Sequence, residues 1–156
     1  NDVVREALRV TGGTEIKHTG DGIMASFSSV ARAVRCAITI QQEIARYDEG
    51  EHPLRLKIGL AAGEPVTEGD DLFGATVQLA ARLCDQAGGG GIVVAGTVRD
   101  LCIGKGFPFS NHVDLELRGF DEPVRAYEVQ WGVAEVSKNG DVRDADNGLA
   151  TAQRLL

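Results

Sequence analysis

The chain has 156 residues, of which 43% are hydrophobic and 25% are charged, and this balance is ordinary for one soluble domain with its own core. Its net charge of −7, without any long Lys/Arg run, gives no basic surface for nucleic acid or for an anionic membrane. No apolar stretch approaches the ~20 residues of a membrane span. We therefore expect no nucleic-acid partner, no membrane insertion of this segment and a cytoplasmic location, whether the chain stands alone or belongs to a larger or membrane-tethered protein.

The hydrophobic pattern changes between helical and strand periods along the chain, with glycine-rich and polar clusters between the elements. It predicts, in chain order, a helix over 3–10, a β-hairpin over 15–27, a helix over 30–47, a strand over 54–60, a helix over 74–84, a strand over 92–95, a helical turn over 97–101 and strands over 113–117 and 124–131. Several strands together with two long helices indicate an α+β sandwich, a mainly antiparallel sheet with helices packed on it.

This regular pattern fails after Trp131. The segment Ser137-Lys138-Asn139-Gly140-Asp141 is typical of a linker, and a final helical turn is predicted over 149–156. We therefore expect one domain over residues 1–132, followed by a linker or C-terminal tail over 133–156.

The three cysteines are an odd number, which argues against a framework of disulfides. Cys36 and Cys84 fall inside helical apolar patterns rather than at loop positions, and Cys102 is the third. They are interpreted as small core residues of a protein in a reducing compartment.

The predicted hairpin carries one acid at its turn. Gly20-Asp21-Gly22 supplies positive φ at low cost, which holds the Asp21 carboxylate at the rim of a sheet, where it can face a ligand. Lys17 lies on the strand that leads into this turn. Taken alone, such an acid is more often part of a plain turn, and such a lysine is more often a solvated strand residue.

A run of four glycines over 88–91 invites comparison with a phosphate-binding loop. That motif requires Gly-Lys-Ser/Thr and leads into a helix, whereas this run lacks the lysine and leads into a predicted strand. We therefore expect a flexible connection between a helix and a strand.

The predicted helix that follows Gly74 carries a polar pair. Gln78 and Arg82 are four residues apart on one helical face, so both can reach one ligand. Asp71 precedes the helix and lies near its N-terminus. The alternative is a solvated Gln and Arg on an exposed face, which is the commoner fate of such a pair.

These motifs resemble those of class III nucleotidyl cyclases, the adenylyl and guanylyl cyclases. The segment Ile16-Lys17-His18-Thr19-Gly20-Asp21 is similar to the family pattern Ile-Lys-Thr-x-Gly-Asp, and residues 117–129 resemble the closing hairpin of bacterial members. The family pattern Asp-x-x-Gly-x-x-Val-Asn-x-Ala-Ser/Ala-Arg, with Gln in place of its Asn, is matched by Asp71, Gly74, Val77, Gln78, Ala80, Ala81 and Arg82. The resemblance spans residues 3–131 and implies a ferredoxin-like α/β sandwich.

The resemblance also implies an activity, the conversion of ATP to 3′,5′-cyclic AMP and pyrophosphate by a two-metal mechanism. Arg82 corresponds to the arginine that stabilises charge on the reacting phosphate, and Gln78 to the asparagine that orients the ribose. Asp21 matches one of the two acids that hold two Mg²⁺ or Mn²⁺ ions. Gln78 keeps the amide of the usual asparagine but adds a methylene, which changes its reach.

Lys17 and Asp71 correspond to the pair that reads the purine. A lysine can donate to adenine N1 and an aspartate can accept from the 6-amino group, so the pair favours ATP and makes a guanylate cyclase less favoured. Arg125 is the candidate contact to the triphosphate, with Arg118 next, although a solvated strand residue is an equally good interpretation of each.

In the family, one active site takes residues from both subunits, so a homodimer is implied. The family's first metal-binding acid lies in a Phe-x-Asp-Ile-x-Gly strand before the first helix, and this motif does not occur in the sequence. The domain is therefore expected to be N-terminally incomplete, without its first strand, and the second metal ligand is absent from this chain.

Two other functions remain as alternatives. The first is a catalytically silent cyclase-like module that binds nucleotide or dimerises in signalling, which Gln78 and the missing acid favour. The retained set of Lys17, Asp21, Asp71 and Arg82 opposes it. The second is an unrelated ferredoxin-like binding domain, which requires every motif match to be accidental.

Overall fold

A computed structural model describes residues 2–19, 22–47, 55–132 and 149–155 of the chain. Its helices and strands, in chain order, are α1 (Asp2–Thr11), β1 (Thr14–Thr19), β2 (Gly22–Phe27), α2 (Val30–Arg46), β3 (Lys57–Gly63), β4 (Val66–Glu68), β5 (Asp71–Phe73), α3 (Ala75–Gln86), β6 (Ile92–Ala95), α4 (Gly96–Leu101), β7 (Val113–Leu115), β8 (Val124–Glu128) and β9 (Leu149–Leu155).

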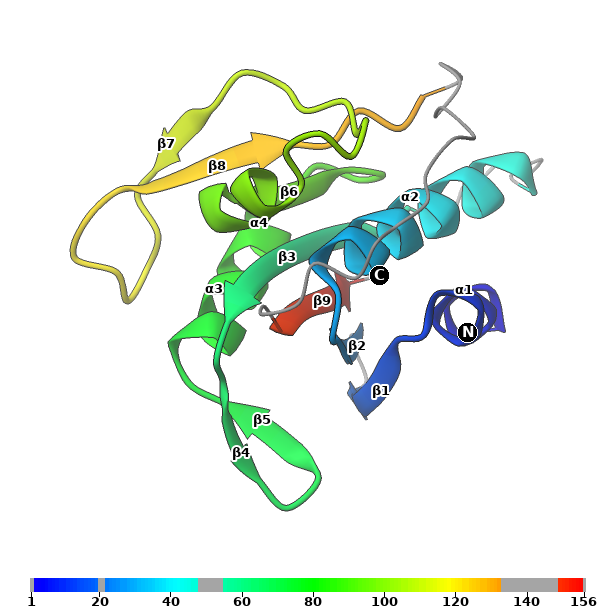
Figure 1. Cartoon of the computed structure of the whole chain (residues 1–156), viewed down its shortest axis with the longest axis horizontal. Helices are drawn as coiled ribbons and strands as arrows, with labels where there is room; N and C mark the ends of the chain where they lie inside the picture. The colour runs from blue at the N-terminus through cyan, green and yellow to red at the C-terminus, as the bar shows by residue number, and fades with distance from the viewer. Residues whose placement is uncertain (1, 20–21, 48–54, 133–148, 156) are drawn as a thin grey trace.

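Within the described residues the main sheet has seven strands in the order β1-β2-β9-β3-β6-β8-β7 (Figure 1). All neighbouring strands are antiparallel except β3 and β6, which are parallel. Strands β4 and β5 form a separate antiparallel pair that projects from the body of the domain (Figure 1). The predicted α+β fold, a mainly antiparallel sheet with helices packed on it, is confirmed.

The helices cover both faces of this sheet, because alternate residues of a strand point to opposite faces. Leu60 of β3 is buried in a cluster with residues of α1, α2 and α4, whereas its neighbour Ala61 is buried in a second cluster with Ala80 and Leu83 of α3. Among the helices that the structure describes, α3 is therefore the one that packs on the second face. That face carries the residues on which the functional argument depends.

Helix α2 begins and packs as the sequence pattern predicts. The Ser29 hydroxyl accepts a hydrogen bond from the Arg32 backbone N–H at 3.3 Å and caps the helix. Gln41 interrupts the apolar stripe of α2 and is 1% exposed. Its side-chain amide donates to the carbonyl oxygens of Leu56 and Gly91 at 3.0 Å and 3.1 Å, which compensates for its burial.

The four glycines over 88–91 connect α3 to β6, as the sequence predicts. The Gly90 N–H donates to the Leu56 carbonyl at 2.7 Å, and the Gly91 N–H donates to the Gly88 carbonyl at 2.8 Å. The Trp131 indole N–H donates to the Gly90 carbonyl at 2.7 Å. Since these two loop amides bond within the fold, they are not available to cradle a phosphate.

Two glycines of β3 allow α3 to approach the sheet closely. A Cβ on Gly59 would lie 2.3 Å from the Ala80 carbonyl oxygen and 2.4 Å from the Cys84 backbone nitrogen. A Cβ on Gly63 would lie 2.5 Å from the Thr76 hydroxyl oxygen. Only glycine fits here, so these positions set the height of α3, and therefore of its polar face, above the sheet.

Two features differ from the sequence predictions. The helical turn predicted over 149–156 is wrong, because residues 149–155 form strand β9 in the middle of the sheet. Backbone pairing on both sides by β2 and β3 decides this conformation, and local pattern does not contain that information. The β4–β5 hairpin, whose strands have three residues each, lies between the predicted strand over 54–60 and the predicted helix over 74–84, where no strand was predicted.

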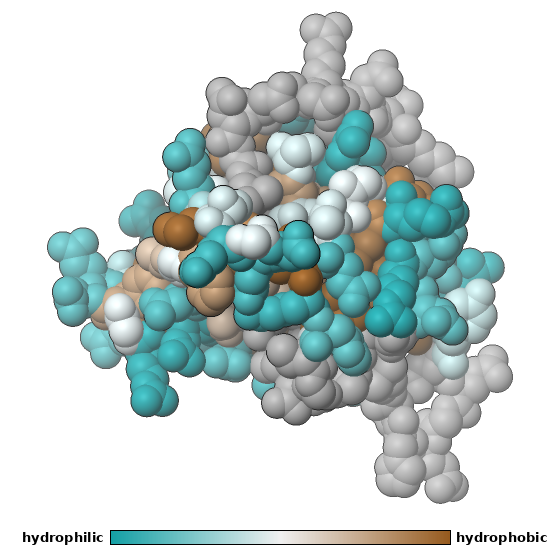
Figure 2. Space-filling model, turned by 90° about the horizontal axis from the view of Figure 1, so that it is seen from below, coloured by the Kyte–Doolittle hydropathy of each residue, from teal (hydrophilic) through white to brown (hydrophobic). Residues whose placement is uncertain are grey.

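The cysteines are in the core, and hydrophilic residues are on the surface. Cys36, Cys84 and Cys102 are all buried and lie outside any disulfide bond, as expected for small core residues. Figure 2 shows the domain from below, and on this face teal hydrophilic residues cover most of the described surface, with smaller brown apolar areas between them. The exposed large apolar residues of the described part include Val66 and Phe73 on the projecting hairpin.

Candidate functional site

The structure brings together Lys17 and Asp71, which the sequence analysis paired. The Lys17 ammonium donates a hydrogen bond from Nζ to Asp71 Oδ2 at 3.2 Å. Their side chains are 43% and 35% exposed, so the ion pair lies at the surface. Such an exposed pair contributes at most about 1 kcal/mol to folding. Its charged groups therefore remain accessible to a ligand.

Neighbouring groups hold both members of this pair in position. The second carboxylate oxygen of Asp71, Oδ1, accepts a hydrogen bond from the Leu72 backbone N–H at 2.8 Å. The Lys17 Nζ atom lies 5.8 Å from the centre of the Phe73 ring, within the range of a cation–π contact. This role of Phe73 was not predicted from the sequence. Phe73 is two positions after Asp71, and side chains at positions i and i+2 of a strand share a face, so this spacing is the signal that indicates the contact.

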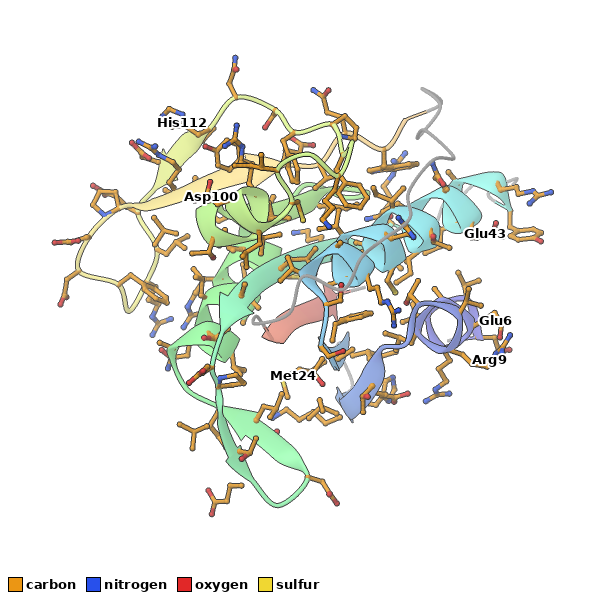
Figure 3. The ribbon with its side chains drawn as sticks, viewed as in Figure 1. Glu6, Arg9, Met24, Glu43, Asp100 and His112 are labelled. Carbon is orange, nitrogen blue, oxygen red and sulfur yellow. The ribbon has the colours of Figure 1, made fainter. Side chains whose placement is uncertain are left out.

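A cavity of about 220 Å³ adjoins the ion pair, between the β1–β2 hairpin and α3. Met24, labelled in Figure 3, belongs to the hairpin wall of this cavity. Its lining residues are Lys17, Gly22, Ile23, Met24, Val77, Gln78 and Ala81. Lys17 and Gln78, two of the predicted site residues, thus face one cavity that is otherwise mostly apolar. The apolar lining residues were not singled out from the sequence.

Arg82 lies one helical turn beyond Gln78 but does not line this cavity. Its Nε atom donates to the Arg118 carbonyl at 3.1 Å, and its Nη1 atom lies 3.6 Å from Asp85 Oδ2. These contacts hold the guanidinium against the loop before β8. The side chain is 37% exposed, so part of the guanidinium fork faces solvent.

Arg125 lies far from the cavity in the order of the sheet. It is on β8, and its Nε atom lies 3.8 Å from Asp114 Oδ1 on the neighbouring strand β7, with both side chains more than half exposed. Strand β8 is next to the sheet edge opposite β1. Within one chain, the structure therefore does not bring Arg125 together with Lys17, Asp71 and Gln78.

The predicted metal ligand Asp21 follows β1 and precedes β2 in the sequence and lies outside the described residues. Among the residues that the structure does describe, no group of three or more His, Cys, Asp or Glu side chains is placed to hold a metal ion. These residues alone therefore do not fit a two-metal centre.

Two of the three cysteines have raised thiol pKa values. Burial raises the pKa of the Cys102 thiol to about 11, and burial also raises the pKa of the Cys36 thiol. Thiols with raised pKa values are poor nucleophiles and poor metal ligands at neutral pH, because the thiolate is the reactive form.

Comparison with known sequence families identifies the class of protein. The family described as the adenylate and guanylate cyclase catalytic domain matches residues 2–131. The chain belongs to this family, and the resemblance stated from its motifs is confirmed.

Particular proteins resemble the chain to different degrees. The uncharacterized protein Rv2212 of Mycobacterium tuberculosis is 36% identical over 144 residues, which are 92% of this chain and 35% of that protein. An adenylate cyclase of Mycosarcoma maydis is 34% identical in an alignment 121 residues long, which covers 61% of this chain and 5% of that protein. A crystal structure of an adenylate/guanylate cyclase/hydrolase from Silicibacter pomeroyi aligns with a TM-score of 0.76 at 29% identity, covering 83% of this chain and 77% of that one.

The chain spans about a third of the length of the first of these relatives. Within the described residues no helix is both long enough and apolar enough to cross a bilayer.

Proposed function

We propose that this domain belongs to an adenylyl cyclase, which converts ATP to 3′,5′-cyclic AMP and pyrophosphate. The observation that carries the proposal is the ion pair between Lys17 and Asp71 beside the cavity of the β1–β2 hairpin and α3. Family membership supports cyclisation of a nucleoside triphosphate. The adenylate cyclase name of the relative from Mycosarcoma maydis supports ATP as the substrate.

The preference for ATP follows from the chemistry of the pair. The Lys17 ammonium is a donor for adenine N1, and the Asp71 carboxylate is an acceptor for the 6-amino group. Guanine presents an acceptor at position 6 and a donor at N1, so each protein group would face a group of the wrong kind. A site built for one hydrogen-bond pattern discriminates against the reversed pattern, because the wrong base, once bound, covers polar groups that then remain unpaired.

The chemistry of the phosphates is assigned to residues of α3 and its surroundings. Arg82 keeps its charge at any physiological pH, and its planar donors suit an oxyanion as charge develops on the reacting phosphate. Gln78 faces the cavity and can hold the ribose by its side-chain amide. Arg125 is assigned to the triphosphate.

The proposal includes the two Mg²⁺ or Mn²⁺ ions that the family resemblance implies, with Asp21 as one ligand. The described residues do not fit such a centre, since they contain no group of three candidate ligands. The second acid must therefore come from outside this chain's described part. We derive no catalytic step through the ions.

A homodimer with shared active sites is part of the proposal. Arg125 lies toward the opposite edge of the sheet from Lys17 in one chain, and a second copy related by a two-fold axis can bring such distant residues together. The projecting β4–β5 hairpin supports this arrangement, because Val66 and Phe73 on it are 62% and 46% exposed.

A catalytically silent module that binds nucleotide or dimerises in signalling is the second candidate. It is favoured by the glutamine at position 78, where the family usually has asparagine. The two candidates share nucleotide binding and differ in turnover.

The test is to incubate the parent protein that contains this domain with ATP or with GTP and Mn²⁺, and to analyse the products by mass spectrometry. The proposal expects cyclic AMP and pyrophosphate from ATP. Binding of ATP without any cyclic product from either nucleotide would support the silent module and refute the cyclase.

A further inference from the structure

The strand that carries Lys17 contains a β-bulge. Along β1, Glu15 lies opposite Ala25 of β2, but Lys17 lies opposite Met24, the adjacent residue of that strand. The register therefore shifts by one residue between them, and Ile16 is the extra residue of β1. A bulge interrupts the regular alternation of side chains along a strand and changes the direction of those that follow it.

The two faces of β2 can be assigned from what packs on them. Ile23 and Ala25 are buried in the cluster that contains residues of α1 and α2. Met24 lies between them, so its side chain points to the other face, and it lines the cavity against α3. Residues directly opposite each other in an antiparallel pair point to the same face. Glu15 therefore faces α1, and Lys17 faces α3.

Two ion pairs agree with this assignment. Arg5 of α1 donates from Nε to Glu15 Oε2 at 3.2 Å, and Lys17 donates from Nζ to Asp71 Oδ2 at 3.2 Å. Strand β1 contacts α1 and also contacts β5 of the projecting hairpin (Figure 1). In a strand without a bulge, residues two positions apart share a face. Lys17 would then turn toward α1 with Glu15, away from Asp71.

We propose that the bulge at Ile16 determines the purine preference of the candidate site, because its place in the strand decides which face of the sheet Lys17 presents. The extra residue separates the glutamate that ties β1 to α1 from the lysine that reads the base. Ile16 is thus a positioning residue, and it acts through its place before Lys17 rather than through its side chain. The inference deepens the proposed function and rests on it for the identity of the ligand.

Two single-residue deletions separate the place of the extra residue from the length of the strand. One chain lacks Ile16 and the other lacks His18, so the deletions lie on opposite sides of the lysine. Both chains have the same length, and β1 has no extra residue in either. Both keep the two ends of the ladder, where Thr19 is opposite Gly22 and Glu15 has its partner on β2.

The deletions differ in the face to which they direct Lys17. Without Ile16, Lys17 stays opposite Met24 and continues to face α3, because adjacent residues of a regular strand point to opposite faces. Without His18, Lys17 moves opposite Ile23 and faces α1. The chain without Ile16 is therefore the matched control for the chain without His18.

The first readout is the position of the Lys17 side chain, measured by NMR in the full chain. Nuclear Overhauser contacts between the Lys17 methylene protons beside Nζ and the Phe73 ring protons report it, since Nζ lies 5.8 Å from the ring centre. We expect these contacts in the parent chain and in the chain without Ile16, and their loss in the chain without His18. Retained contacts without His18, or lost contacts in a folded chain without Ile16, would overturn the proposal.

The second readout is the purine preference of the parent protein that contains this domain. Deletion of His18 should lower the ratio of kcat/KM for ATP to kcat/KM for GTP by at least about tenfold, and deletion of Ile16 should change it by less than about twofold. Equal ratios in the two deletion chains would overturn the proposal. Absence of any cyclic nucleotide from the undeleted protein would refute the proposed function, and the Overhauser contacts would still decide the position of Lys17.

A third measurement uses the unmodified chain and covers the case in which a deletion chain fails to fold. Overhauser contacts between backbone protons identify which residues lie opposite each other in an antiparallel pair. The strongest cross-strand contacts are expected between Lys17 and Met24 and between Glu15 and Ala25. Contacts of Lys17 with Ile23 in place of Met24 would show a ladder without the bulge and would overturn the proposal.

Discussion

Lys17 and Asp71 are 54 positions apart in the sequence, and their side chains meet at 3.2 Å between Nζ and Oδ2. The β1–β2 hairpin supplies one residue, and the small β4–β5 hairpin supplies the other. Because the pair is partly exposed, its contribution to folding is small. The proposed role of the pair is to bind the purine, and the first prediction tests it.

The first prediction exchanges the hydrogen-bonding pattern of this pair. Lys17→Glu together with Asp71→Cys should lower kcat/KM for ATP by at least about tenfold and raise kcat/KM for GTP, because a carboxylate can accept from guanine N1–H. The control is His18→Glu with Asp70→Cys, which places the same new residues one position away. If the ratio of kcat/KM for ATP to kcat/KM for GTP were the same in the double variant as in the parent protein, the purine assignment would be refuted.

The second prediction concerns the arginine on α3. Arg82→Lys should lower kcat by about a hundredfold with a smaller change in KM, because lysine keeps the charge but loses the planar set of donors. Arg99→Lys is the matched control, since Arg99 lies on α4 and pairs with Asp100 and the Tyr127 ring. Steady-state kinetics with the parent protein measures both. If Arg82→Lys kept normal turnover, Arg82 would have no role in charge stabilisation.

The third prediction restores the residue that the family usually has. Gln78→Asn should raise kcat, by a few-fold to about tenfold, because the shorter side chain brings the amide to the distance at which it orients the ribose. Gln86→Asn, at the C-terminal end of the same helix, controls for the change in helix propensity. A lower kcat in Gln78→Asn would show that the cavity is adapted to glutamine.

The fourth prediction tests the close approach of α3 to β3. Gly59→Ala should destabilise the domain by about 1–3 kcal/mol, since its Cβ would overlap the backbone of Ala80 and Cys84. Urea denaturation of the full chain measures this loss. Gly88→Ala has no neighbour within 4 Å of the added Cβ and should have little effect. Equal stabilities of the two variants would contradict the close packing.

The fifth prediction is a pH dependence from a buried thiol. The pKa of Cys102 is raised from 9.0 to about 11 in the folded chain. Between these two values the unfolded chain has released the proton and the folded chain has kept it, so stability falls as pH rises from about 9 toward 11. Denaturation midpoints of the parent chain and of Cys102→Ala should diverge over this range. Parallel pH profiles would show that the thiol is not protected by burial.

The sequence predicts those parts of the fold that depend on local pattern. The periodic apolar residues of α2 place that helix close to its observed bounds. Gly22, expected to supply positive φ in the turn, is instead the first residue of strand β2 and is not among the glycines with positive φ. The pairing of Lys17 with Asp71 was expected only from the family resemblance. Neither residue carries a local signal for a partner so distant in the sequence.

Other parts depend on contacts between distant segments, which no local pattern records. Strand β9 pairs with residues about ninety to more than one hundred positions earlier, so a short segment with helical composition becomes an interior strand. The contact of Lys17 with the Phe73 ring and the cavity beside Gln78 also arise only when β1, β5 and α3 meet.

The most direct measurement of the central claim is a competition between the two purine nucleotides. The parent protein that contains this domain is incubated with equal concentrations of ATP and GTP and with Mn²⁺, and cyclic AMP and cyclic GMP are quantified in the same sample by mass spectrometry. With Lys17 and Asp71 intact, cyclic AMP should exceed cyclic GMP by at least about tenfold. Cyclic GMP in excess, or no cyclic nucleotide at all, would contradict the assignment of an adenylyl cyclase.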